Sequence, residues 1–144
     1  MKKQIITTSV LLLFIIPGIV AQKVDDKNVP VAVKATIGKE YPSITKLKWE
    51  KEKENYEASF VLSKTALSVL LDANGNILER EVEITADVLP PTVLAYVKQH
   101  YPGKKVTELA KITDAKNEVT YEVEVKGMDL IFDSKGNFMK ELKD

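Results

Sequence analysis

The feature of this sequence that most constrains its fold is an internal repeat. Short landmarks recur in the same order, 60 to 65 positions further along the chain. Because the matches keep their order and fall at turns and helix ends, they indicate a tandem duplication of one supersecondary unit. The recurring landmarks are Val29-Pro30 and Leu89-Pro90, Tyr41-Pro42 and Tyr101-Pro102, Tyr56-Glu57 and Tyr121-Glu122, and the pattern Asp-x-x-Gly-Asn that begins at Asp72 and at Asp133.

The first 21 residues have the pattern of a secretory signal peptide. Lys2 and Lys3 form a basic start, an apolar run extends from Ile5 to Ile16, and small residues lead to a cleavage site near Ala21. The apolar run is shorter than the roughly 20 residues that a membrane-spanning helix needs, which disfavours a retained membrane anchor. We therefore predict an exported protein with no membrane span after cleavage.

The remaining chain divides into a first repeat at 22–85 and a second at 86–144, which together suit one compact domain. Without Lys2 and Lys3, the chain has 19 basic and 21 acidic residues, which gives a formal charge of −2. Nothing in this balance favours phosphate binding, so we expect no nucleic-acid partner. The absence of cysteine excludes disulfides, thiolate metal sites and a cysteine nucleophile.

Each repeat reads as a short helix followed by about four antiparallel strands. The helices begin near Pro30 and Pro90 and stop before Pro42 and Pro102, because proline disfavours helix at the residue before it. The following segments alternate apolar and polar residues with a period of two, as in strands with one buried face. The sequence therefore predicts an α+β fold in which the helices pack on one face of the sheet. The predicted core aromatic residues are Trp49, Tyr56, Phe60, Tyr121 and Phe132.

These landmarks resemble a known family, the PepSY-like or beta-lactamase-inhibitor-like group of exported bacterial proteins. The residues that carry the resemblance are Val29-Pro30, Tyr41-Pro42, Trp49, Tyr56-Glu57-Ala58, Asp72-x-x-Gly75, Leu89-Pro90, Tyr101-Pro102, 121–124, and 129–133 followed by Gly136. The resemblance implies a tandem repeat with a curved antiparallel sheet in the Gram-negative periplasm. It also implies a binding protein that modulates or inhibits an envelope enzyme such as a protease.

One loop offers candidate ligands for Ca²⁺. Asp72, Asn74, Asn76 and Glu79 place oxygen atoms at alternating positions, and Ca²⁺ prefers oxygen ligands. The spacing does not match the EF-hand loop, and Asp, Asn and Gly are also the ordinary residues of tight turns. Both interpretations remain open, with a calcium-binding or calcium-regulated protein as the alternative function.

The strand face opposite the helices is the candidate surface for a protein partner. Glu79, Glu81 and Glu83 share one side of a strand. We expect these acidic faces to be solvated and to have lysines as cross-strand neighbours. The residues predicted to point outward for partner binding are Lys46, Lys48, Glu50, Glu57, Glu122 and Glu124, together with Ser59 and Asp129.

No catalytic constellation is visible. His100 is the sole histidine and lies at the end of the second helix, and no phosphate-binding glycine loop is present. We therefore predict a non-enzymatic binding or regulatory protein with an envelope protein as its partner. The partner's identity and the oligomeric state are not encoded in any recognisable motif.

Overall fold

The computed structural model describes residues 21–143, so that the predicted leader, apart from Ala21, lies outside the described residues. The helices are α1 (Val31–Glu40) and α2 (Pro91–His100), preceded by the 3-10 turns η1 (Asp26–Asn28) and η2 (Ala86–Val88). The strands are β1 (Gln22–Lys23), β2 (Thr45–Glu52), β3 (Asn55–Leu62), β4 (Thr65–Leu71), β5 (Ile77–Glu83), β6 (Val106–Asp114), β7 (Val119–Val125), β8 (Met128–Asp133) and β9 (Phe138–Lys143).

All the described strands form one antiparallel sheet in which each strand pairs with its neighbours in the sequence, from β1 to β9. The first repeat supplies α1 and β2–β5, and the second supplies α2 and β6–β9. The two repeats meet where β5 pairs with β6, from Glu79 opposite Asp114 to Glu83 opposite Ala110. This pairing makes the sheet continuous across the duplication.

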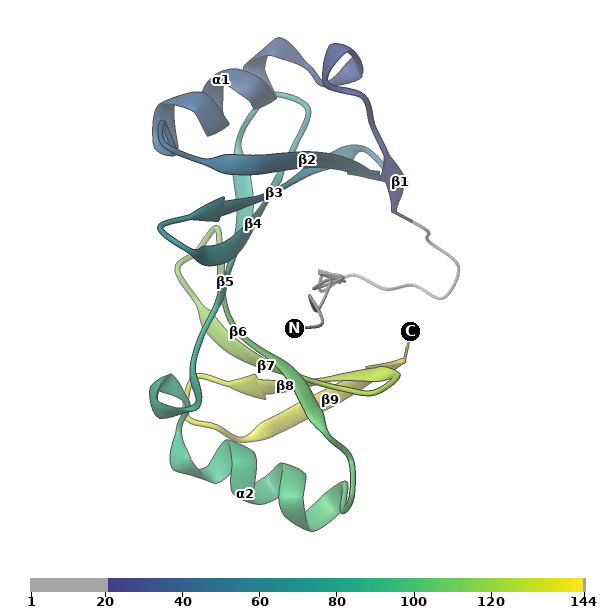
Figure 1. Ribbon diagram of the computed structural model, residues 1–144, viewed down its shortest axis with the longest axis vertical. Helices are drawn as coiled ribbons and strands as arrows, with labels where there is room; N and C mark the ends of the chain where they lie inside the picture. The colour runs from purple at the N-terminus through teal and green to yellow at the C-terminus, as the bar shows by residue number, and fades with distance from the viewer. Residues whose placement is uncertain (1–20, 144) are drawn as a thin grey trace, which may run out of the picture.

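The sheet is curved, and both helices lie on its outer, convex side (Figure 1). Each helix covers its own hydrophobic core: Val33 and Ile37 of α1 pack on the first repeat, and Val93 and Val97 of α2 pack on the second. Trp49, Phe60 and Phe132 are buried in these cores, and Tyr56 and Tyr121 are half-buried against them. The predicted α+β tandem fold, with helices on one face, is confirmed.

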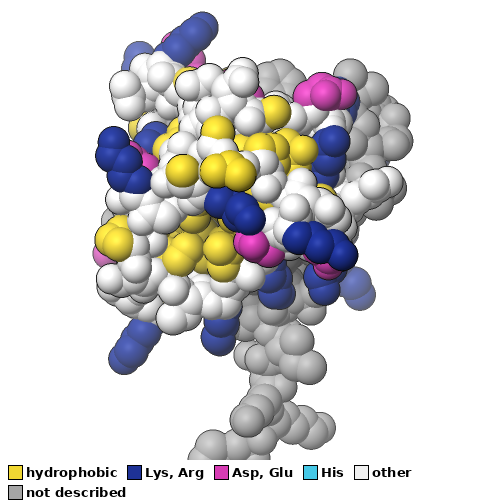
Figure 2. Space-filling view, turned by 90° about the horizontal axis from the view of Figure 1, so that it is seen from above, with side chains coloured by type: hydrophobic (Ala, Val, Ile, Leu, Met, Phe, Trp, Pro, Cys, Tyr) yellow, Lys and Arg dark blue, Asp and Glu magenta, His cyan; other side chains and the backbone are white. Residues whose placement is uncertain are grey.

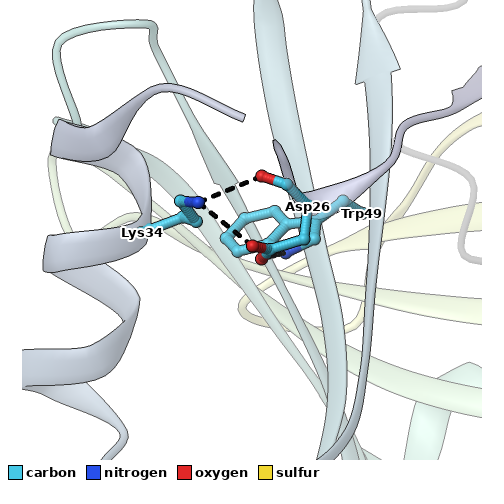
Figure 3. Close-up of polar contacts among 3 residues, drawn as sticks. All are labelled: Asp26, Lys34 and Trp49. Atoms are coloured by element: carbon cyan, nitrogen blue, oxygen red, sulfur yellow. Dashed lines mark hydrogen bonds and ion pairs between the residues drawn. The ribbon is translucent and has the colours of Figure 1, made fainter. Parts of the chain in front are cut away.

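Polar contacts of Asp26 hold η1 against α1 and β2 at the start of the first repeat. The indole N–H of Trp49 donates to Asp26 Oδ1 at 3.2 Å, and Lys34 Nζ lies 3.0 Å from Asp26 Oδ2 (Figure 3). Asp26 therefore links η1 to both α1 and β2. In the second repeat the equivalent positions hold Ala86, Leu94 and Leu109, and both leucines pack against the second core. The same junction is thus polar in one repeat and apolar in the other.

The β4–β5 turn is held against α1 by close contact of backbone with backbone. Thr36 Oγ1 donates to the carbonyl oxygen of Gly75 at 2.9 Å. Gly75 has a φ of +84°, and a Cβ atom there would lie 2.7 Å from the carbonyl oxygen of Ala32. The β8–β9 turn repeats this arrangement, with Thr92 Oγ1 donating to the carbonyl oxygen of Gly136 at 3.1 Å. Glycine is therefore required at both turns for its conformation and for its small size.

We expect Gly75→Ala to destabilise the fold by about 2 kcal/mol or more. The substitution combines left-handed strain of ~1 kcal/mol with overpacking of ~1–3 kcal/mol. Gly127→Ala is the matched control, because Gly127 has a φ of +81° with nothing within 4 Å of the added atom. Urea unfolding of both variants measures the difference. Equal losses of stability would show that the approach of the turn to α1 contributes nothing.

Candidate functional site

The candidate site is the concave face of the sheet, opposite the helices. Directly opposed residues of an antiparallel sheet point to the same face, so the strand pairing defines which side chains lie there. One row runs from Lys48 through Ser59, Ser68 and Glu81 to Ile112. A second row runs from Glu83 through Ala110, Glu122 and Ile131 to Lys140. Both repeats contribute to this surface.

Acidic and basic side chains occupy different strands of this face. On the central strands, β3 to β8, the charged side chains that the pairing places on the concave face are all acidic. The basic side chains Lys23, Lys48 and Lys140 belong to the outer strands β1, β2 and β9. The acidic side chains on the concave face, including those of β2, are Glu50, Glu52, Glu57, Glu79, Glu81, Glu83, Glu108, Asp114, Glu122, Glu124, Asp129 and Asp133.

Five of these acids are buried rather than solvated. We call Glu57, Glu79, Glu81, Glu122 and Asp129 the concave carboxylate cluster. The exposed fraction is 1% for Glu57, 4% for Glu81 and 3% for Glu122. One carboxylate oxygen of each of Glu57, Glu79, Glu81 and Glu122 is buried without a hydrogen-bond partner.

The expectation of solvated acidic strands with lysine neighbours is therefore wrong for this cluster. Glu79 lies opposite Leu70 and Asp114, and Glu122 lies opposite Ala110 and Ile131. Glu83, at the end of β5, is exposed as predicted. Period-two alternation identified the shared face, but it could not show that carboxylates of several strands converge there.

Burial and mutual repulsion raise the pKa values of the four glutamates of the cluster. For Glu57, burial raises the pKa to about 8, helped by the negative charges of Glu52 and Glu50 and opposed by the hydroxyls of Ser68 and Ser59. Burial also raises the pKa of Glu79 to about 7, and Asp114 adds to the rise.

Glu81 and Glu122 interact electrostatically across the junction of the repeats. The pKa of each is raised first by burial, and then by the other acids of the face: Glu122 acts on Glu81, and Asp129 acts on Glu122. In the absence of a compensating cation, the protonated forms are favoured near neutral pH. The site is therefore a group of carboxyl groups that a nearby positive charge would ionise.

The structure places five of the six predicted partner-binding residues on the concave face: Lys48, Glu50, Glu57, Glu122 and Glu124. Lys46 is the exception. Thr45 pairs with Val61 and Lys48 with Ser59, so that a β-bulge sets Lys46 and Leu47 together opposite Phe60. Phe60 belongs to the core under α1, which removes Lys46 from the concave rows. The bulge also leaves Leu47 39% exposed.

The candidate calcium loop is a turn closed by its own hydrogen bonds. Asp72 Oδ1 accepts the backbone N–H groups of Asn74 and Asn76, each at 2.9 Å, and Asp72 Oδ2 accepts the Asn76 side-chain amide at 2.8 Å. These bonds lower the pKa of Asp72. Glu79 instead belongs to the concave carboxylate cluster. Among the described residues, no group of three or more His, Cys, Asp or Glu side chains is arranged to hold a metal ion. The loop geometry thus favours the turn interpretation and gives calcium no support.

A third turn of the same kind was not predicted from the sequence. Asp114 Oδ1 accepts the backbone N–H groups of Lys116 and Glu118, each at 2.8 Å, and Asn117 takes the left-handed conformation that glycine has in the other two turns. The signal was present as Asp-x-x-Asn, since asparagine tolerates this conformation better than other residues do. The turn connects β6 to β7 and places Asp114 beside Glu79.

The α1 side of the molecule presents a second, different surface. Seen from that side, hydrophobic side chains lie at the surface with lysine and arginine around them (Figure 2). Val31 at the start of α1 is 81% exposed, and Ala32 and Ala35 are exposed beside it. These residues carry no group for catalysis, hydrogen bonding or metal binding, so we take the concave face as the candidate site. Within the described residues, no helix is long and apolar enough to cross a membrane.

A tandem α+β protein with a curved sheet and an acidic concave face is the class that the fold and site define. The chain belongs to the family described as "Putative beta-lactamase-inhibitor-like, PepSY-like", whose profile matches residues 19–79 and again residues 72–140. Among curated proteins, none matches this chain.

Solved structures from Bacteroides species share the fold. A "BLIP-like protein" from Bacteroides fragilis has a TM-score of 0.62 and 27% identity over 79% of this chain and 86% of that one. A "putative periplasmic" protein from Bacteroides eggerthii has a TM-score of 0.70 at 18% identity, over 80% and 88% of the two chains. A DUF2874 family protein from Bacteroides uniformis has a TM-score of 0.69 at 21% identity, over 79% and 88%.

The raised pKa values predict that stability falls as pH rises. The folded chain keeps protons that an unfolded glutamate releases above its ordinary pKa of 4.5, up to the folded pKa of about 8 for Glu57. The free energy of unfolding should therefore decrease between pH 5 and pH 8.5. Glu57→Gln should flatten this decrease and be more stable than the parent at pH 8.5 by at least ~1 kcal/mol.

Urea unfolding at several pH values measures this effect. Glu54→Gln is the control, because Glu54 is exposed in the turn between β2 and β3. An identical pH dependence in the parent and Glu57→Gln would contradict the assignment of a raised pKa to Glu57.

Proposed function

We propose that this chain is a non-enzymatic protein of the bacterial periplasm that binds an envelope protein with its concave sheet face. The observation that carries the proposal is the arrangement of the sheet. Both helices cover the convex face, and the concave face collects charged and incompletely hydrogen-bonded side chains from both repeats. Buried polar groups without partners are costly, and a binding partner can supply the missing contacts.

The residue inventory supports binding rather than catalysis. His100 lies on the helical side, where its Nδ1 is 3.0 Å from the carbonyl oxygen of Tyr96 and its ring stacks on Tyr96. It is therefore remote from the concave carboxylates and cannot serve as their base. The surface cavities beside Lys51 and Tyr56, and beside Tyr101 and Lys104, include none of the concave carboxylate cluster in their linings.

The family description supports a more specific role for this binding. Its beta-lactamase-inhibitor-like description and the BLIP-like protein of Bacteroides fragilis support a role in inhibiting or modulating an enzyme of the envelope. The periplasmic description of the Bacteroides eggerthii protein supports the same compartment for this chain. An envelope protease is one such enzyme.

Site-specific photo-cross-linking tests the proposal. The full chain is produced in a Bacteroides host with p-benzoylphenylalanine in place of Lys48, which is exposed on a concave row, or in place of Lys39, which is exposed on α1. We expect a single protein to cross-link from position 48 and not from position 39, and mass spectrometry to identify it as an envelope protein. The purified partner should then bind this protein in isolation.

Two results would count against the proposal. Cross-linking from position 39 alone would move the interface to the helical side, and no adduct from either position would remove a stable protein partner. Repeating the experiment with EDTA tests the calcium-regulated alternative, which requires that chelation abolish the adduct.

A further inference from the structure

The concave carboxylate cluster joins the two repeats at the centre of the face. Glu57 on β3 and Glu122 on β7 occupy equivalent positions in the two repeats. Glu81 on β5 lies between them in the strand order and interacts electrostatically with both. The cluster is thus a composite of both repeats, formed where β5 pairs with β6.

Three features of the face specify the charge of its ligand. Within the described residues, the concave rows of β3 to β8 carry carboxylates and no basic side chain. One oxygen of each of Glu57, Glu79, Glu81 and Glu122 is buried without a hydrogen-bond partner. Lysine and arginine are confined to the outer strands on these rows, as Lys23, Lys48 and Lys140. A ligand that fits this pattern has positive charge at its centre and donates hydrogen bonds.

We propose that the concave carboxylate cluster receives lysine or arginine side chains from a cationic segment of the protein partner. This inference rests on the proposed function and specifies the chemistry of the partner. Ammonium and guanidinium groups carry the donors that the buried carboxylate oxygens lack, and charge-assisted hydrogen bonds are among the stronger ones. A nucleic acid would be repelled by the same charges. A resident metal ion is less suited, because the described carboxylates form no metal-binding group.

The protonation of the cluster gives this interaction a distinctive signature. Near neutral pH the buried carboxyl groups of Glu57, Glu81 and Glu122 hold protons. An incoming cation favours their ionised form, so that binding should release protons. Affinity should therefore rise between pH 6 and pH 8.5. An ordinary surface carboxylate is already ionised throughout this range, and lysine remains charged, so non-specific ion pairing would show no such rise.

Other charged groups face the cluster from the strands around it. The acidic groups are Glu50 and Glu52 on β2, Glu83 on β5, Glu108 and Asp114 on β6, and Glu124 on β7, and the basic groups are Lys23, Lys48 and Lys140. Burial and Glu124 raise the pKa of Glu108 to about 7, so it titrates within the same range.

Isothermal titration calorimetry tests the proposal with octalysine and octaarginine as probes and octaglutamate as the negative control. The protein is purified from the periplasm after export of the full chain. Comparison of phosphate and Tris buffers reports proton release, because their ionisation enthalpies differ. We expect binding of both cationic peptides, net proton release, and an affinity that increases with pH.

Matched variants locate the interaction. Glu81→Gln with Glu122→Gln should weaken octalysine binding about tenfold or more and remove most of the proton release. Glu54→Gln, at the exposed β2–β3 turn, should bind as the parent does. Thermal unfolding of the double variant confirms that it is folded, and these substitutions remove the ionisable groups while keeping the side-chain size.

Several outcomes would overturn the inference. These are failure of both cationic peptides to bind, binding without proton release, equal binding by the double variant, or binding of Ca²⁺ alone in a parallel titration. A further outcome separates this inference from the proposed function. If a protein cross-links from position 48 but presents no lysine or arginine to the concave face, the proposed function stands and the cationic partner is excluded.

Discussion

The pairing of β5 with β6 is the interaction on which the rest of this structure depends. It joins the last strand of one repeat to the first strand of the next, with Glu79 opposite Asp114 and Glu83 opposite Ala110. Without it each repeat would be a short sheet with an exposed edge, which invites aggregation. With it the two sheets become one curved surface, and Glu81 lies between carboxylates of both repeats. A single backbone ladder therefore determines both the continuity of the fold and the composition of its concave face.

The two faces of this sheet serve opposite physical purposes. The convex face is closed by α1 and α2, whose buried valines and isoleucine form two hydrophobic cores. The concave face carries buried carboxyl groups that lower stability as pH rises, because ionisation without a partner is unfavourable. Natural proteins commonly accept such a cost where a site must be ready for a ligand. Under the proposed function, the hydrophobic core of the convex face supports a concave face that binds a partner.

The repeats also show how a duplicated unit can diverge without losing its fold. Asp26, Lys34 and Trp49 form a hydrogen-bonded junction in the first repeat, where Ala86, Leu94 and Leu109 stand in the second. Either set fills the same space between the 3-10 turn, the helix and the first long strand. By contrast, the turns at Gly75 and Gly136 are alike in conformation and in their contact with a helix threonine. Positions constrained by backbone geometry have remained alike, whereas a junction at the margin of the core has not.

The sequence by itself determined the repeat, the α+β class, the buried aromatic residues and the face shared by Glu79, Glu81 and Glu83. These follow from local rules: proline stops, turn residues, and the period of a strand. The tertiary structure alone decided that Glu79 and Glu81 are buried beside Glu57 and Glu122, and that a bulge removes Lys46 from their face. Such features depend on the pairing register and on the proximity of residues more than 20 positions apart in the sequence, such as Glu57 and Glu81. A local sequence pattern therefore cannot predict them. The electrostatic character of the site is therefore a property of the assembled sheet.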